Sequence, residues 1–143
     1  MPIQKYPYHD WDINAVLFER KRNNCALVLS HLEKYAVVQM CGIQEIVFVD
    51  FSLANSIEYF ESYTGADQTE GLLTDKLFDI FFKGANKEKW IKDAVRDIAE
   101  MKNTFLFIAS NFECSIRAIC QSIIDSGPLS HDDLQKIVSN YIV

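Results

Sequence analysis

The residues with the clearest chemical potential are seven acids in one stretch of chain that contains no lysine or arginine. This stretch runs from Tyr35 to Asp75. Its acids are Glu45, Asp50, Glu58, Glu61, Asp67, Glu70 and Asp75. The formal charge of the whole chain is −6, so this one stretch accounts for all of the excess negative charge. Concentrated carboxylates attract cations and accelerate association with a positively charged partner.

Aromatic residues lie among these acids, most densely in the run from Glu58 to Tyr63. Aromatic side chains are frequent anchors in protein interfaces. We therefore expect a docking site for a basic protein. The residues expected to contact the partner are Asp50, Glu58, Glu61, Tyr63, Asp67 and Glu70. The competing interpretation is an ordinary solvated face that has no partner.

Other chemistries have little support in the sequence. It contains no nucleophile elbow, glycine-rich phosphate loop, zinc-protease motif or EF-hand loop. The four cysteines, at positions 25, 41, 114 and 120, include no CxxC pair, and we interpret them as small buried hydrophobic residues. We therefore expect no catalytic residue, cofactor or metal. The remaining enzymatic alternative is a site assembled from residues distant in sequence, for example His31 with paired carboxylates.

A second functional class depends on the basic residues Lys89, Lys92 and Arg96, which share one face of a predicted helix next to Trp90. Such a face can contact phosphate groups, which makes a helical nucleic-acid-linked regulator or accessory protein the alternative function. Acids at i,i+4 spacing indicate instead a solvent face crossed by weak ion pairs. The net negative charge also argues against nucleic-acid binding. A short basic cluster, Arg20 to Arg22, fits a helix end or an oligomer contact.

Length and composition predict a single globular domain spanning residues 1–143, with 49% apolar residues and 24% charged residues. The N-terminus lacks the apolar run of a signal peptide, and uncharged stretches are too short to cross a membrane. We therefore expect a cytoplasmic protein that makes no membrane contact.

The scarcity of chain breakers favours helices. The chain has only five glycines and three prolines, whereas an all-β chain of this size is expected to show turn signals every 8–12 residues or so. We predict a mainly α fold, a compact bundle of four to five helices. Residues 43–63 are interpreted as one of these helices, and a small β element near residues 45–51 is the alternative because Ile46 to Val49 is a β-branched and aromatic run.

Periodicity supports the same fold class. Apolar residues recur at spacings of three, four or seven from Ile91 to Ile123, which predicts helix with an interruption near residues 102–104. Ser130 is predicted to cap a final helix, with Asp132 and Asp133 in its first turn. Leu134, Ile137, Val138 and Tyr141 then form the apolar face of that helix.

Together these patterns predict a non-enzymatic acidic binding protein that neutralises a basic protein partner. Small immunity or inhibitor proteins of bacterial toxins, including nucleases, are one class with this charge and size. Such an inhibitor places carboxylates against the lysines and arginines with which a nuclease holds phosphate.

Overall fold

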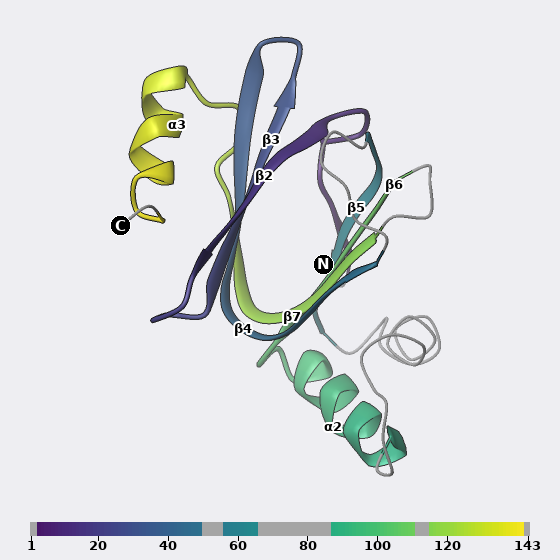
Figure 1. Cartoon of the computed structure of the whole chain (residues 1–143). Helices are drawn as coiled ribbons and strands as arrows, with labels where there is room; N and C mark the ends of the chain where they lie inside the picture. The colour runs from purple at the N-terminus through teal and green to yellow at the C-terminus, as the bar shows by residue number, and fades with distance from the viewer. Residues whose placement is uncertain (1–2, 50–55, 66–86, 111–114, 142–143) are drawn as a thin grey trace.

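The fold is one strongly curled antiparallel sheet with two helices on its outer face (Figure 1). The computed structural model describes residues 3–49, 56–65, 87–110 and 115–141. The strands are β1 (Ile3–Lys5), β2 (Asp12–Glu19), β3 (Asn24–His31), β4 (Lys34–Val49), β5 (Ile57–Tyr63), β6 (Thr104–Ser110) and β7 (Ser115–Asp125). The helices are α2 (Lys87–Ala99) and α3 (His131–Val138). The strand order across the sheet is β1-β5-β6-β7-β4-β3-β2.

The sheet curls far enough for its two sides to meet. The start of β2 approaches the start of β5 through a bridge between Asp12 and Ser56, whose hydroxyl donates to the Asp12 carboxylate at 3.2 Å. Backbone bonds also join Ile57 to Asp10 and to Trp11, each at 2.8 Å. The inner face of the sheet therefore encloses a core of its own.

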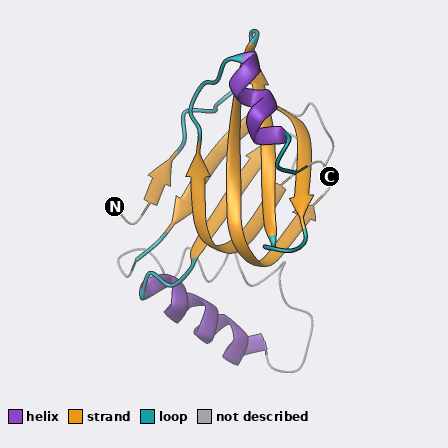
Figure 2. Cartoon of the chain, turned by 90° about the vertical axis from the view of Figure 1, so that its left-hand side faces the viewer, coloured by secondary structure: helices purple, strands orange, loops and turns teal. Residues whose placement is uncertain are grey.

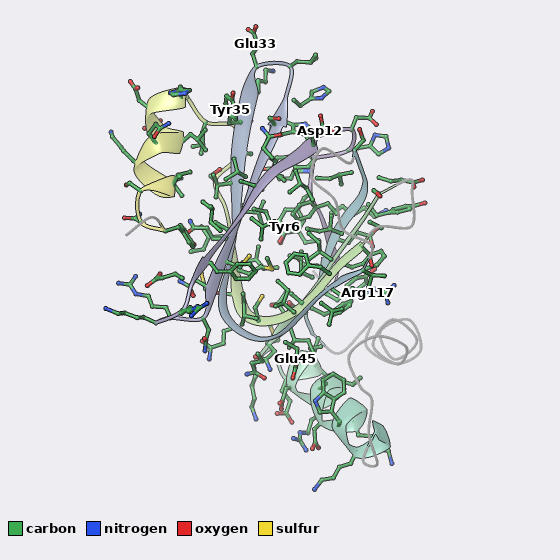
Figure 3. The ribbon with its side chains drawn as sticks, in the orientation of Figure 1. Tyr6, Asp12, Glu33, Tyr35, Glu45 and Arg117 are labelled. Atoms are coloured by element: carbon green, nitrogen blue, oxygen red, sulfur yellow. The ribbon has the colours of Figure 1, made fainter. Side chains whose placement is uncertain are left out.

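Side chains of alternate strand residues fill this inner core. It contains the aromatic residues Tyr6, Tyr8, Trp11 and Phe60, and Figure 3 shows Tyr6 inside the curl. Aliphatic residues and the thiols of Cys25 and Cys120 complete it. The Tyr8 hydroxyl donates to the Asp125 carboxylate, and burial together with this carboxylate raises the pKa of Tyr8.

The two helices cover separate parts of the outer face (Figure 2). Helix α3 packs on β2–β4, where Leu134 contacts the cluster of Ala26, Val28 and Val37. Helix α2 packs beneath the bend of β4 and β7, where Ile98 joins the cluster of Tyr63, Phe105 and Ile119. The strands under the helices are buried on both faces. Their sequences are therefore continuous apolar runs, without the alternation of apolar and polar residues that marks a half-exposed strand.

The predicted bundle of four to five helices is therefore wrong, since the described residues form a mainly antiparallel β structure. Residues 43–49 and 57–63, interpreted as parts of one helix, belong to β4 and β5. The small β element considered near residues 45–51 corresponds, over its described residues 45–49, to the end of a 16-residue strand. Likewise, among the described residues of the stripe from Ile91 to Ile123, the first part belongs to α2 and the later residues to β6 and β7. The predicted interruption near residues 102–104 does lie where α2 gives way to β6.

The turn between β3 and β4 explains the error. Leu32 and Glu33 occupy it with φ angles of 47° and 68°, the left-handed conformation that two-residue hairpin turns require. Asparagine and glycine normally fill these positions, and Leu-Glu gives no turn signal in a sequence. Counting glycines and prolines therefore missed a tight hairpin.

The final helix is confirmed as predicted. The Ser130 hydroxyl accepts a hydrogen bond from the backbone N–H of Asp133 at 3.2 Å, which satisfies one free amide of the first turn. Apolar residues of α3 pack on the sheet, and the Tyr141 hydroxyl donates to Gln39 at 2.7 Å. No helix among the described residues is long and apolar enough to cross a membrane.

Candidate partner-binding cleft beside helix α2

The bend of β4 creates the geometry of the candidate site. The pairing of β4 with β7 shifts register between Ile43 and Glu45, so the strand bulges there. Gly42 precedes the bulge with φ +64°, a conformation that glycine adopts without steric cost. The bulge directs Gln44 and Glu45 to the outer face, next to α2, and Figure 3 shows Glu45 beside this helix.

A cleft of about 280 Å³ lies between this bulge and α2. Glu45 comes from β4, while Asp93 and Asp97 come from consecutive turns of α2. Trp90, Ala94 and Ile119 form apolar walls, and Gln44 and Asn103 add two amides. Of the described residues that line this acidic cleft, three carry carboxylates and none carries a positive charge.

The amides fix one side of the acidic cleft. The Gln44 and Asn103 side chains donate to each other reciprocally, both at 3.3 Å, and Asn103 is only 4% exposed. The Asn103 and Lys102 backbone N–H groups also donate to the Asp97 carbonyl, at 3.2 and 2.8 Å. These bonds join the end of α2 to the bulge of β4, so the distance between the acids of the two elements is held by the fold.

Arg96 lies beside two of the acids. It approaches Asp93 at 3.2 Å and Asp97 at 3.6 Å, but its side chain is 58% exposed, so these pairs are screened and weak. The Glu45 side chain is exposed and forms no ion pair or hydrogen bond with any residue that the structure describes, while its backbone pairs with β7. With three carboxylates and one arginine, this region has a net negative charge.

The predicted contact residues fall into two groups. Asp50, Asp67 and Glu70 lie outside the described residues. Glu58, Glu61 and Tyr63 lie on β5, and Glu61 accepts a hydrogen bond from the Tyr63 hydroxyl at 2.6 Å. Tyr63 is 2% exposed, and burial with the Glu61 carboxylate raises its pKa.

The sheet register relates β5 to the acidic cleft. One cross-strand row runs through Tyr63, Phe105, Ile119 and Glu45. Three strand spacings of about 4.8 Å place Glu45 about 14 Å from Tyr63, with the α2 cluster between them. Tyr63 therefore belongs to the apolar surface on which α2 packs. Glu61, on the same strand, is paired with Lys5 of β1.

Sequence reasoning did not select Asp93 and Asp97. The sequence feature that could have identified them is the pair of like charges at i,i+4 spacing, which lowers helix stability unless a cation compensates for it. Glu45 lies within the acidic stretch but was not chosen, since a helical reading of residues 43–63 placed it away from Asp50, Glu58 and Glu61.

The basic residues of the alternative function lie on the same helix. Lys89 and Lys92 are exposed, while Arg96 pairs with Asp93 and Asp97. The cations of α2 are thus mixed with acids, and nucleic-acid binding stays an untested prediction.

Among the described residues, two thiols and one histidine take part in packing. Burial raises the pKa of the Cys25 and Cys120 thiols to about 12, so both are protonated at neutral pH. The His31 ring stacks on Trp11 with centroids 5.8 Å apart. Within residues 3–49, 56–65, 87–110 and 115–141, no group of three or more His, Cys, Asp or Glu side chains is arranged to hold a metal ion.

Comparison with known proteins shows the fold alone. No family model and no curated protein matches the chain. A crystal structure of an uncharacterized protein from Neisseria gonorrhoeae is similar, with a TM-score of 0.52 and 10% sequence identity. The match covers 88% of this chain and 98% of the other.

Proposed function

We propose that this chain is a non-enzymatic binding protein whose acidic cleft receives a lysine or arginine side chain of a basic protein partner. The observation that carries this proposal is the set of Glu45, Asp93 and Asp97 around one space of about 280 Å³. This volume lies just below the usual range for small-molecule pockets, about 300–1,000 Å³, and suits one inserted side chain.

The chemistry of the acidic cleft fits both parts of such a side chain. Lysine and arginine have apolar stems that pack against apolar walls while their charged ends reach polar groups. Trp90, Ala94 and Ile119 supply these walls, and the carboxylates supply acceptors for the charged end. An arginine also forms bidentate bonds with a carboxylate, which makes it the better fit to an acidic site.

Electrostatics supports the same partner. Charge-assisted bonds in a partly enclosed site are stronger than exposed ion pairs, which contribute about 0.2–1 kcal/mol each. The negative charge of the chain also raises the association rate with a basic partner, an effect that falls with ionic strength. An inhibitor of a bacterial toxin, acting in the cytoplasm, remains the specific form of this proposal.

A basic peptide tests the acidic cleft without a known partner. The affinity of acetylated nona-arginine is measured by calorimetry for the protein and for the variant Glu45→Gln/Asp93→Asn/Asp97→Asn. The matched control, Glu33→Gln/Asp132→Asn/Asp133→Asn, removes the same charge at the β3–β4 turn and at the start of α3.

We expect the cleft variant to bind at least 10-fold more weakly and the control to change by less than 3-fold. Equal losses in the two variants would mean that the peptide responds only to net charge, and the acidic cleft would then have no role. Urea unfolding of both variants confirms that the fold is retained.

A further inference from the structure

A second pocket lies where the inner core reaches solvent, at the turn between β2 and β3. Its volume is about 210 Å³, and Phe18, Ile43 and Ile46 supply its apolar lining. Ile43 and Ile46 pack against the inner core, whereas Phe18 is 51% exposed and meets the Phe48 ring edge-on at 6.2 Å. We name this space the apolar pocket.

The wall of the apolar pocket is held by two hydrogen bonds. The Ile43 N–H donates to the Asn23 carbonyl at 2.8 Å, and the Gly42 N–H donates to the Asn24 side chain at 3.2 Å. These bonds attach the β2–β3 turn to the bulge of β4. The apolar pocket is therefore formed before any ligand arrives, which lowers the entropic cost of binding.

The turn above the apolar pocket carries three consecutive cations, Arg20, Lys21 and Arg22. Glu19 also lines the apolar pocket, and Arg22 approaches its carboxylate at 3.5 Å, but the Arg22 side chain is 78% exposed, so this pair is screened and weak. Arg20 also lines the apolar pocket, and it forms no ion pair with any residue that the structure describes. An available guanidinium at the edge of an apolar space favours a ligand with one anionic end.

We propose that the apolar pocket binds a small amphipathic carboxylic acid, with its apolar body between Phe18 and Ile46 and its carboxylate at Arg20. The volume exceeds the roughly 150 Å³ of an engineered cavity that holds benzene, so one ring with a short chain fits. This site lies on the inner face of the β4 segment whose outer face lines the acidic cleft, and its charge preference is opposite, so its ligand differs from the proposed protein partner.

An NMR titration tests this site with 3-phenylpropionate and its uncharged analogue 3-phenylpropan-1-ol. We expect saturable shifts of the backbone amides of Phe18, Asn24, Ile43 and Ile46, and affinity for the acid at least 3-fold above that for the alcohol. The absence of saturable shifts at millimolar acid, or shifts confined to other regions, would overturn the proposal.

Two variants of the turn provide matched controls. Arg20→Gln and Lys21→Gln remove the same charge from adjacent positions, but only Arg20 lines the apolar pocket. Arg20→Gln is expected to weaken binding of the acid at least 3-fold and to leave the alcohol unchanged, while Lys21→Gln changes the affinity for the acid by less than 2-fold. Equal effects on the acid would refute the role of Arg20. Because Arg20→Gln leaves Glu45, Asp93 and Asp97 in place, nona-arginine binding separates failure of this proposal from failure of the first.

Discussion

The two faces of β4 at its bulge have opposite chemistry within four consecutive residues. Ile43 and Ile46 line the apolar pocket on the inner face, whereas Gln44 and Glu45 line the acidic cleft on the outer face. Strand side chains normally alternate between the two faces, and the bulge instead places two consecutive residues, Gln44 and Glu45, on the same outer face. One short segment can therefore shape two sites, because a curled sheet has an inside and an outside.

The largest expected effect concerns the helix that completes the outer site. Ile98→Ala removes a fully buried side chain on the sheet-facing side of α2 and is expected to destabilise the protein by about 3 kcal/mol. Because α2 carries Asp93 and Asp97, nona-arginine affinity should fall as well. Leu134→Ala in α3 is the control, since it loosens the other helix and should leave peptide affinity unchanged. Urea unfolding and calorimetry measure both quantities, and peptide binding lost equally in both variants would argue against a special role for α2.

An asparagine on the inner face of β4 should lower the free energy of unfolding more than an asparagine on the outer face. Ile46→Asn puts an amide against the inner core and is expected to lower the free energy of unfolding by about 2 kcal/mol. Glu45→Asn places the same amide in solvent on the outer face, where the expected change is within about 0.5 kcal/mol. Isoleucine also has the higher strand propensity, which adds to the expected cost of Ile46→Asn. Equal destabilisation in denaturant titrations would show that the two faces are not distinct.

The inner core should also make stability sensitive to alkaline pH. The pKa of Cys25 and Cys120 is about 12 in the fold and near 8.5 in an unfolded chain. The protonated thiol is therefore favoured by folding, and its stabilising effect is complete below about pH 8.5 and is lost as pH rises toward 12.

Between pH 7 and 9.5 each thiol should account for about 1.4 kcal/mol of lost stability. Urea unfolding at the two pH values, compared between the protein and Cys25→Ala/Cys120→Ala, isolates this contribution. A pH dependence that is the same in both proteins would contradict the burial of these thiols.

The smallest expected effect is at the other end of β4. Leu32→Asn/Glu33→Gly puts the residues that favour left-handed turns at φ 47° and 68°. We expect a stabilisation of about 0.5 kcal/mol, measured as a higher urea midpoint with an unchanged slope. Leu32 is 81% exposed, so its removal costs little burial. A lower midpoint would indicate that these side chains support the turn in another way.

Particular residues show how far sequence reasoning reached. The Ser130 cap and the apolar face of α3 were predictable because both depend on neighbours within one helix. The β-branched and aromatic run from Ile46 to Val49 indicated a strand, but the scarcity of glycine and proline favoured a helix there. Phe105 and Phe107 face the α2 cluster, while Leu106 and Ile108 face the inner core, so β6 showed no alternation that would identify it as a strand.

By itself the sequence determined an acidic middle segment, a capped final helix and enough apolar residues for a buried core, since composition and i to i+4 relations are local. Only the tertiary structure brought Glu45 of β4 to Asp93 and Asp97 of α2, which lie 48 and 52 positions further along the chain. That contact depends on strand pairing, on the bulge after Gly42 and on the docking of Ile98 against Phe105. Such pairings form between residues far apart in the chain, so no local pattern encodes them.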